Sequence, residues 1–168
     1  VDHCGLMNEF NEIIVSCSSA GSLTGEYRGE DGLREQNPLH RPYVNICKIL
    51  TSYKEVAPDK LITPWQNLPE LRGPLTQIGF FDFGDLHFEV YEGQGGHLPG
   101  EIVLIDYNNN IAFTGDVYIN THGLTAEQAE YNQYAPILMT SVDTDPKLCS
   151  EERKAIMRRL GVGNWKIF

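Results

Sequence analysis

Three short segments of the sequence place histidine or aspartate beside glycine, which suits a metal site. They are Asp2-His3-Cys4-Gly5, Gly95–Gly100 around His97, and Phe113-Thr114-Gly115-Asp116. Imidazole and carboxylate groups together are ligands that zinc and iron accept. Each segment taken singly also fits a simpler interpretation: a disordered chain end, a loop histidine or an ordinary turn. The three together favour metal chemistry.

Two predicted strand pairs would position the second and third segments. The pairs are Ile78–Phe83 with Leu86–Tyr91, and Ile102–Ile105 with Ile111–Phe113. Gly84-Asp85 is typical of a hairpin turn, and the asparagines of Asp106–Asn110 tolerate the positive φ that a tight turn needs. His97 follows the first pair and Asp116 ends the second. Both would therefore be held at strand ends by a rigid scaffold.

Helical patterns surround these strands. Pro42 stands at a predicted helix start, and the apolar residues that follow at helical spacing would face a core: Tyr43, Ile46, Cys47, Leu50 and Tyr53. Thr125 and Gln128 have the spacing of a capping box, and a last helix is predicted from Asp145-Pro146 to Gly161. Residues 165–168 have the pattern of a short strand. Together, these helices and strands predict an α+β layered domain.

The stretch before Pro42 gives a less regular pattern. Residues 6–10 predict a short helix, and residues 12–17 predict a short buried strand. Residues 18–40 are rich in Ser, Gly, Glu and Arg without apolar periodicity, so we expect a long loop there. Residues 60–63 predict one short strand.

Charge and composition exclude several classes of protein. The 168 residues carry 13 Lys+Arg against 23 Asp+Glu, a net charge of −10, so we expect neither nucleic-acid nor anionic-membrane binding. No apolar run approaches the roughly 20 residues of a membrane helix. The four cysteines are scattered without a C-x-x-C pair, which is typical of reduced thiols. We expect a soluble, cytoplasmic protein.

Three stretches, in this order, resemble the metallo-β-lactamase superfamily: Phe81–Val90, Gly96–Asp106 and Ile111–Asp116. The second contains His-x-Pro-Gly at His97, and the third ends in Thr-Gly-Asp at Asp116. Asp2-His3-Cys4-Gly5 matches the end of that family's His-x-His-x-Asp-His signature. The resemblance covers the chain nearly end to end, and residues 18–75 match least.

The resemblance implies an αββα sandwich over residues 1–168, lacking its N-terminal part, with residues 18–60 as a loop-plus-helix insertion near the active site. By motif, His97 would bind a first metal, Asp2 and His3 a second, and Asp116 both. Two zinc ions are expected in the intact protein, with iron or manganese as alternatives. The family's remaining histidines would precede Val1 and follow Phe168. We therefore expect a fragment that is inactive by itself.

The function that the resemblance implies is a metal-dependent hydrolase. It would use metal-activated hydroxide on a small ester, thioester or lactone, with Asp2 as the catalytic residue that orients the hydroxide and accepts its proton. His122 and Tyr118 would line the substrate pocket, although His122 also fits a surface loop. Two alternatives stay open on the same fold. One is a redox protein similar to the flavodiiron branch, and the other is a non-catalytic member with a degenerate site.

Overall fold

The computed structural model describes residues 4–65, 67, 72–119, 123–133 and 143–168. The chain divides into two compact units, Val1–Pro64 and Trp65–Phe168. A single domain over residues 1–168 stays a prediction. Within the described ranges, no helix is long and apolar enough to cross a membrane.

The first unit contains short elements: 3₁₀ helices η1 (Met7–Glu9) and η2 (Pro58–Lys60), helices α1 (Cys17–Tyr27) and α2 (Arg41–Leu50), and strands β1 (Ile13–Ile14) and β2 (Leu61–Ile62). The two strands pair in parallel. The short helix near residue 7, the helix after Pro42 and the strand near residue 61 are confirmed.

Helix α1 corrects the prediction of a loop over residues 18–40, which is wrong for residues 18–27. Ser16 begins the helix, because its side chain accepts a hydrogen bond of 3.1 Å from the Ser19 N–H. The helix is made largely of Ser, Gly, Thr and Ala, and only Gly25 is buried. It therefore has no apolar stripe for a periodicity argument to detect. The strand predicted over residues 12–17 is also too long, since β1 has two residues and Ile14 is exposed.

The predicted core face of α2 is wrong for three of its residues. Tyr43, Ile46 and Leu50 are each at least half exposed, whereas Val44 and Cys47 are buried. Apolar residues occur on both sides of this short helix, so the spacing alone does not decide which side is buried.

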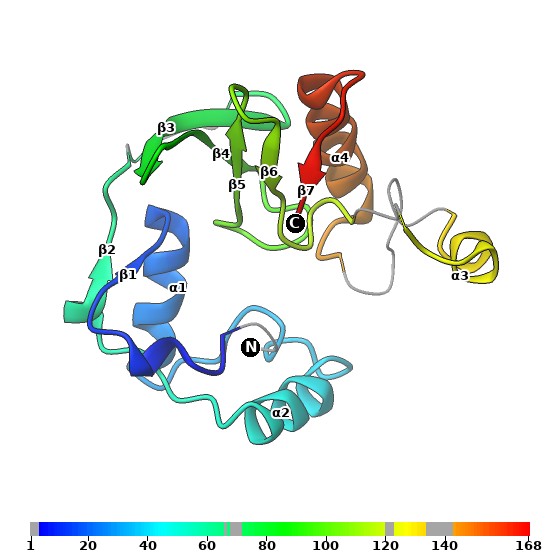
Figure 1. The fold of residues 1–168 in the computed structure, drawn as a ribbon. Coiled ribbons are helices and arrows are strands. Elements are labelled where there is room, and N and C mark those ends of the chain that lie inside the picture. Colours follow the sequence, from blue (N-terminus) through cyan, green and yellow to red (C-terminus); the bar gives the residue numbers. More distant parts are fainter. Residues whose placement is uncertain (1–3, 66, 68–71, 120–122, 134–142) are drawn as a thin grey trace. The chain divides into compact units, whose positions relative to one another are not determined.

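The second unit is built on a five-stranded sheet in the order β3-β4-β5-β6-β7. The strands are β3 (Leu75–Phe83), β4 (Leu86–Gly93), β5 (Ile102–Asp106), β6 (Ile111–Phe113) and β7 (Lys166–Ile167). The first four are antiparallel neighbours, and β7 returns parallel to β6. Both predicted strand pairs are confirmed, as is the final strand (Figure 1).

Among the described residues after β6, the helices are α3 (Ala126–Tyr131) and α4 (Pro146–Leu160). The capping box is confirmed, because Thr125 Oγ1 accepts from the Gln128 N–H at 3.2 Å and Gln128 Oε1 from the Thr125 N–H at 3.0 Å. Asp145 caps the start of α4, accepting from the Leu148 N–H at 3.0 Å. Gly161 ends this helix with a φ of +61°.

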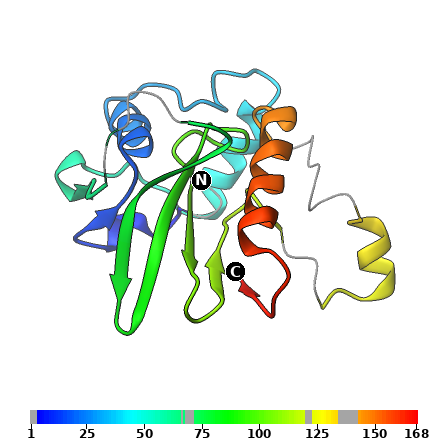
Figure 2. The same cartoon turned by 90° about the horizontal axis from the view of Figure 1, so that it is seen from above.

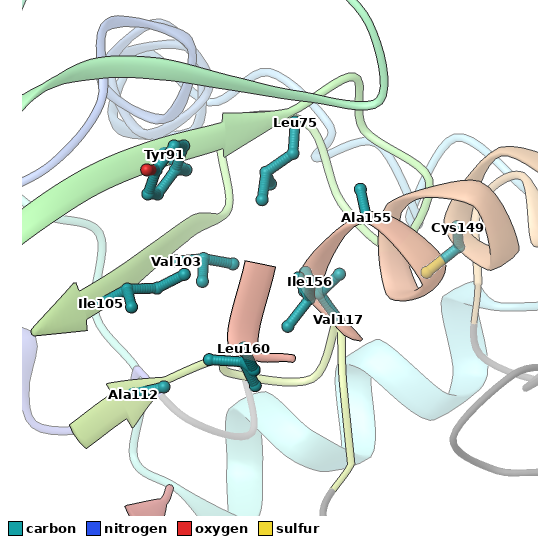
Figure 3. Close-up of a cluster of buried hydrophobic side chains, with 10 residues drawn as sticks. All are labelled: Leu75, Tyr91, Val103, Ile105, Ala112, Val117, Cys149, Ala155, Ile156 and Leu160. Atoms are coloured by element: carbon teal, nitrogen blue, oxygen red, sulfur yellow. The ribbon is translucent and has the colours of Figure 1, made fainter. Parts of the chain in front are cut away.

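Helix α4 runs along one face of the sheet, and the core lies between them (Figures 1 and 2). Figure 3 shows side chains from both elements pointing toward one another, among them Tyr91 and Val103 from the strands and Ile156 and Leu160 from the helix. A second cluster, Trp65, Ile78 and Val90, is buried on the opposite face. The α+β class is confirmed, and the αββα sandwich stays a prediction.

The β5–β6 turn depends on Asp106, a fully buried carboxylate. It accepts hydrogen bonds from the backbone N–H of His87, Asn108 and Asn109, at 3.2, 2.8 and 3.1 Å, and from the Asn109 side chain at 2.8 Å. Burial alone would raise the pKa of Asp106, but these hydrogen bonds outweigh it and hold the pKa below its ordinary value.

We expect Asp106→Asn to lower the free energy of unfolding by about 2 kcal/mol at pH 7, because an amide cannot accept all four hydrogen bonds. A carboxyl whose folded pKa is lowered stabilises the fold above its unfolded pKa of about 3.9, and this contribution disappears as pH falls through the folded value. Urea unfolding at pH 7 and pH 3 should therefore show a deficit that shrinks in acid. Asp85→Asn, in the exposed β3–β4 turn, is the control. An equal deficit at both pH values would contradict this account.

Candidate functional site

The structure brings His97 and Asp116 together at one end of the five-stranded sheet. His97 lies on the loop between β4 and β5 and is 3% exposed, and Asp116 follows β6. The distance from His97 Nε2 to Asp116 Oδ2 is 3.7 Å. Two of the four residues predicted to bind metal are thus neighbours in the fold.

The other ring nitrogen of His97 faces Asp143, with 3.0 Å between Nδ1 and Oδ1. Asp143 also accepts two hydrogen bonds from Arg153, at 2.7 and 2.8 Å. Burial alone would raise the pKa of Asp143, but hydrogen bonds from Arg153 and His97 outweigh it and lower the pKa. The carboxylate is therefore ionised at neutral pH and can only accept, so His97 Nδ1 carries a hydrogen and donates a hydrogen bond to Asp143. In the neutral ring, the lone pair of Nε2 then faces Asp116.

Arg153 links this contact to the segment that carries Asp116. Its guanidinium is fully buried in α4, and its Nε donates a hydrogen bond of 2.6 Å to the carbonyl of Val117. The same side chain therefore holds the partner of His97 and the residue after Asp116. This arrangement restricts where both candidate ligands can lie.

The His97 loop is also fixed through its backbone. The Gly96 N–H donates to Glu152 Oε1 at 3.1 Å, and the Thr144 hydroxyl donates to the His97 carbonyl at 2.7 Å. A Cβ atom at Gly96 would overlap the backbone N and Cα of Cys149. Glycine is therefore required at this approach between the loop and α4.

Glu101 lies near His97 and Asp116, and in the described part of the chain only one of its two carboxylate oxygens accepts a hydrogen bond. Its Oε1 accepts a hydrogen bond of 2.9 Å from the Asp116 N–H, whereas the buried Oε2 has no hydrogen-bond partner among the described residues. Burial raises the pKa of Glu101, and the neighbouring His97 acts in the opposite direction. A buried carboxylate oxygen in this state is stabilised by a proton or by a cation.

The described surroundings of His97 carry an excess of acidic groups. Four carboxyl groups, Glu101, Asp116, Asp143 and Glu152, are accompanied by the guanidinium of Arg153. Burial raises the pKa of Glu152 as it does that of Glu101, although backbone N–H groups of residues 94–96 oppose the effect. Such a distribution attracts a cation, which would relieve the unfavourable burial of negative charge.

The remaining predicted site residues stay predictions. Asp2, His3 and His122 lie outside the described residues. Tyr118 is half-buried, packs against the core cluster under α4, and accepts a hydrogen bond of 2.7 Å from Thr114 Oγ1 through its carbonyl. Within the described part of the chain, no group of three or more His, Cys, Asp or Glu residues is arranged to hold a metal ion.

All four cysteines have free thiols, as their spacing indicated. Cys149 is fully buried in α4 behind the His97 loop, and burial raises its pKa. A thiol of this kind is a poor nucleophile, so the site offers imidazole and carboxylate chemistry instead.

Four residues around His97 were not predicted from the sequence: Glu101, Asp143, Glu152 and Arg153. For Glu152 and Arg153, the sequence pattern of α4 did contain an indication of burial. Cys149, Ile156 and Leu160 are buried along one stripe of the helix, and Glu152 and Arg153 fall on the same stripe. Charged residues at core-facing positions indicate buried partners. No comparable pattern marks Asp143 or Glu101.

Comparisons of the chain with known protein families, with curated proteins and with solved structures found no match. Membership of the metallo-β-lactamase superfamily therefore remains a prediction from the sequence motifs.

Proposed function

We propose that this protein is a metal-dependent hydrolase of the metallo-β-lactamase type, with His97 and Asp116 as metal ligands. The observation that carries the proposal is the placement of the His97 ring between the carboxylates of Asp143 and Asp116. Its Nδ1 donates to the ionised Asp143, and its Nε2 faces Asp116. Metal-binding histidines nearly always donate their second ring N–H to a carboxylate, a carbonyl or water, which fixes the tautomer and makes the ligand nitrogen more basic.

The separation of the two candidate donor atoms supports the same assignment. Ligands about 2.1 Å from one tetrahedral zinc ion lie about 3.4 Å from each other. The observed 3.7 Å between Nε2 and Oδ2 is close to that value. The unpartnered Glu101 Oε2 and the acidic surroundings also fit a cation at this place.

Each described residue has a defined part in this proposal. His97 and Asp116 would hold the ion, Asp143 and Arg153 orient the imidazole, and Glu101 fixes the backbone at Asp116. Bound zinc lowers the pKa of water from about 15.7 to about 7, which supplies a nucleophile at neutral pH. By motif alone, Asp2 and His3 would bind a second metal ion, together with Asp116.

The substrate class in this proposal is the one that the family resemblance implies: a small ester, thioester or lactone. The test is a panel of these three classes, assayed with the protein as its gene encodes it and supplied with zinc. We expect hydrolysis of at least one class, lost on chelation and restored by zinc. His97→Ala should reduce kcat/KM by about 100-fold or more.

The matched control is His87→Ala, because His87 lies on β4 with a half-exposed side chain paired with Asp82. It should leave hydrolysis within about twofold of the parent protein, as expected for a surface substitution. Hydrolysis that survives both chelation and His97→Ala would refute the proposal. So would a zinc-loaded protein that hydrolyses none of the three classes.

A further inference from the structure

We propose that Glu152 is a positioning residue that sets the place of His97 by holding the backbone of its loop. The inference rests on the proposed function, since its importance lies in the metal ligand that the loop carries. Glu152 belongs to α4, which is distant in sequence from the loop, and the residue is 1% exposed.

The carboxylate of Glu152 lies against both ends of a four-residue segment before His97. Its Oε1 accepts the Gly96 N–H at 3.1 Å. A Cβ atom at Gly93 would lie 2.7 Å from Oε1, and one at Gly96 would lie 2.6 Å from Oε2. The glycines thus allow the backbone to approach the carboxylate more closely than any other residue would.

The energetics of this contact select one loop conformation. A buried carboxylate is unfavourable unless a hydrogen-bond donor faces it, and here the donor is the backbone N–H of Gly96. Any loop conformation that turns this N–H away leaves the carboxylate buried without that donor. The loop is therefore held in the conformation that presents His97.

Two adjacent residues of α4 consequently control His97 in different ways. Arg153 acts on the ring through Asp143, which accepts the hydrogen bond from His97 Nδ1. Glu152 acts on the backbone at Gly96, one residue before the imidazole. Ring orientation and loop position together place Nε2 beside Asp116.

The test compares Glu152→Gln with two controls on the same helix. Glutamine keeps the size of the side chain and one carbonyl oxygen, but it removes the charge and puts an NH₂ donor in place of the second oxygen. Glu151→Gln removes the same charge from an exposed neighbour paired with Lys154. Ile156→Val lowers stability by about 1 kcal/mol at a fully buried position, and Ile156 belongs to the core cluster under α4.

Two measurements are made on each variant, using the protein as its gene encodes it. The first is the Kd for zinc, which Glu152→Gln should raise by about 10- to 100-fold and the controls by less than about twofold. The second is the ¹⁵N spectrum of the His97 ring without metal. One Nδ1-protonated form is expected in the parent protein and both controls, and a mixture of ring states in Glu152→Gln.

The outcomes separate this inference from the proposed function. If the parent protein binds no zinc at His97, the proposed function fails, and the ring spectrum still decides whether Glu152 positions the imidazole. If zinc binds and Glu152→Gln matches Ile156→Val in both Kd and ring spectrum, the inference is overturned while the function stands.

Discussion

Arg153→Met is expected to lower the free energy of unfolding by about 3–5 kcal/mol, one of the two largest effects that we predict for a single substitution. Arg153 and Asp143 form a doubly hydrogen-bonded pair whose side chains are both completely buried. Methionine would leave the carboxylate of Asp143 buried without its cation, and the carbonyl of Val117 would lose its donor. Urea denaturation at pH 7 measures the change.

Two further variants make this result interpretable. Lys154→Met, at the next position in α4, removes an exposed cation and should change stability by less than about 0.5 kcal/mol. The double variant Asp143→Leu/Arg153→Met removes both charges, and it should lose less than the sum of the single losses. A loss below about 1 kcal/mol for Arg153→Met would show that the buried pair does not hold this region together.

Gly96→Ala is expected to lower stability by about 3 kcal/mol, the upper end of the range for inserting a methyl group into a packed site. The added Cβ would overlap the backbone of Cys149, which cannot rotate away as a side chain can. Because the loop must shift, the His97 ring should also lose its contact with Asp143. Thermal unfolding and the His97 ring spectrum measure the two consequences.

The control for this substitution is Gly21→Ala. Gly21 lies within α1, and a Cβ atom there would meet nothing within 4 Å. Alanine at a helix interior position is favoured over glycine by about 0.5–1 kcal/mol, so this variant should be more stable than the parent chain. Equal effects of the two substitutions would mean that the loop does not approach α4 closely.

The sequence predicted the elements whose signals are local. The β3–β4 hairpin, the asparagine-rich turn after β5, the capping box at Thr125 and the ends of α4 each depend on residues within a few positions of one another. Helix α1 was missed because its small residues carry no apolar period. The buried side of α2 was misjudged because burial depends on what packs against a helix, not on the helix alone.

The candidate site was predictable only in part for the same reason. His97 and Asp116 stand out because glycine and strand ends mark them in the sequence. Other residues of the site are far from the loop in sequence: Asp143 is 46 positions from His97, and Glu152 is 56 positions from Gly96. Arg153 reaches His97 only through Asp143, and the packing of α4 brings these residues to the loop. These residues come near His97 only through the tertiary structure, and no local sequence motif predicts it.

The most direct measurement of the central claim is the zinc content of the protein, purified as its gene encodes it, by elemental analysis after dialysis against buffered zinc. We expect bound zinc in the parent protein and in the His87→Ala control. The His97→Ala variant should retain at least tenfold less at the same free zinc concentration. A His97→Ala variant that binds as much zinc as the parent would contradict the assignment of His97 as a metal ligand.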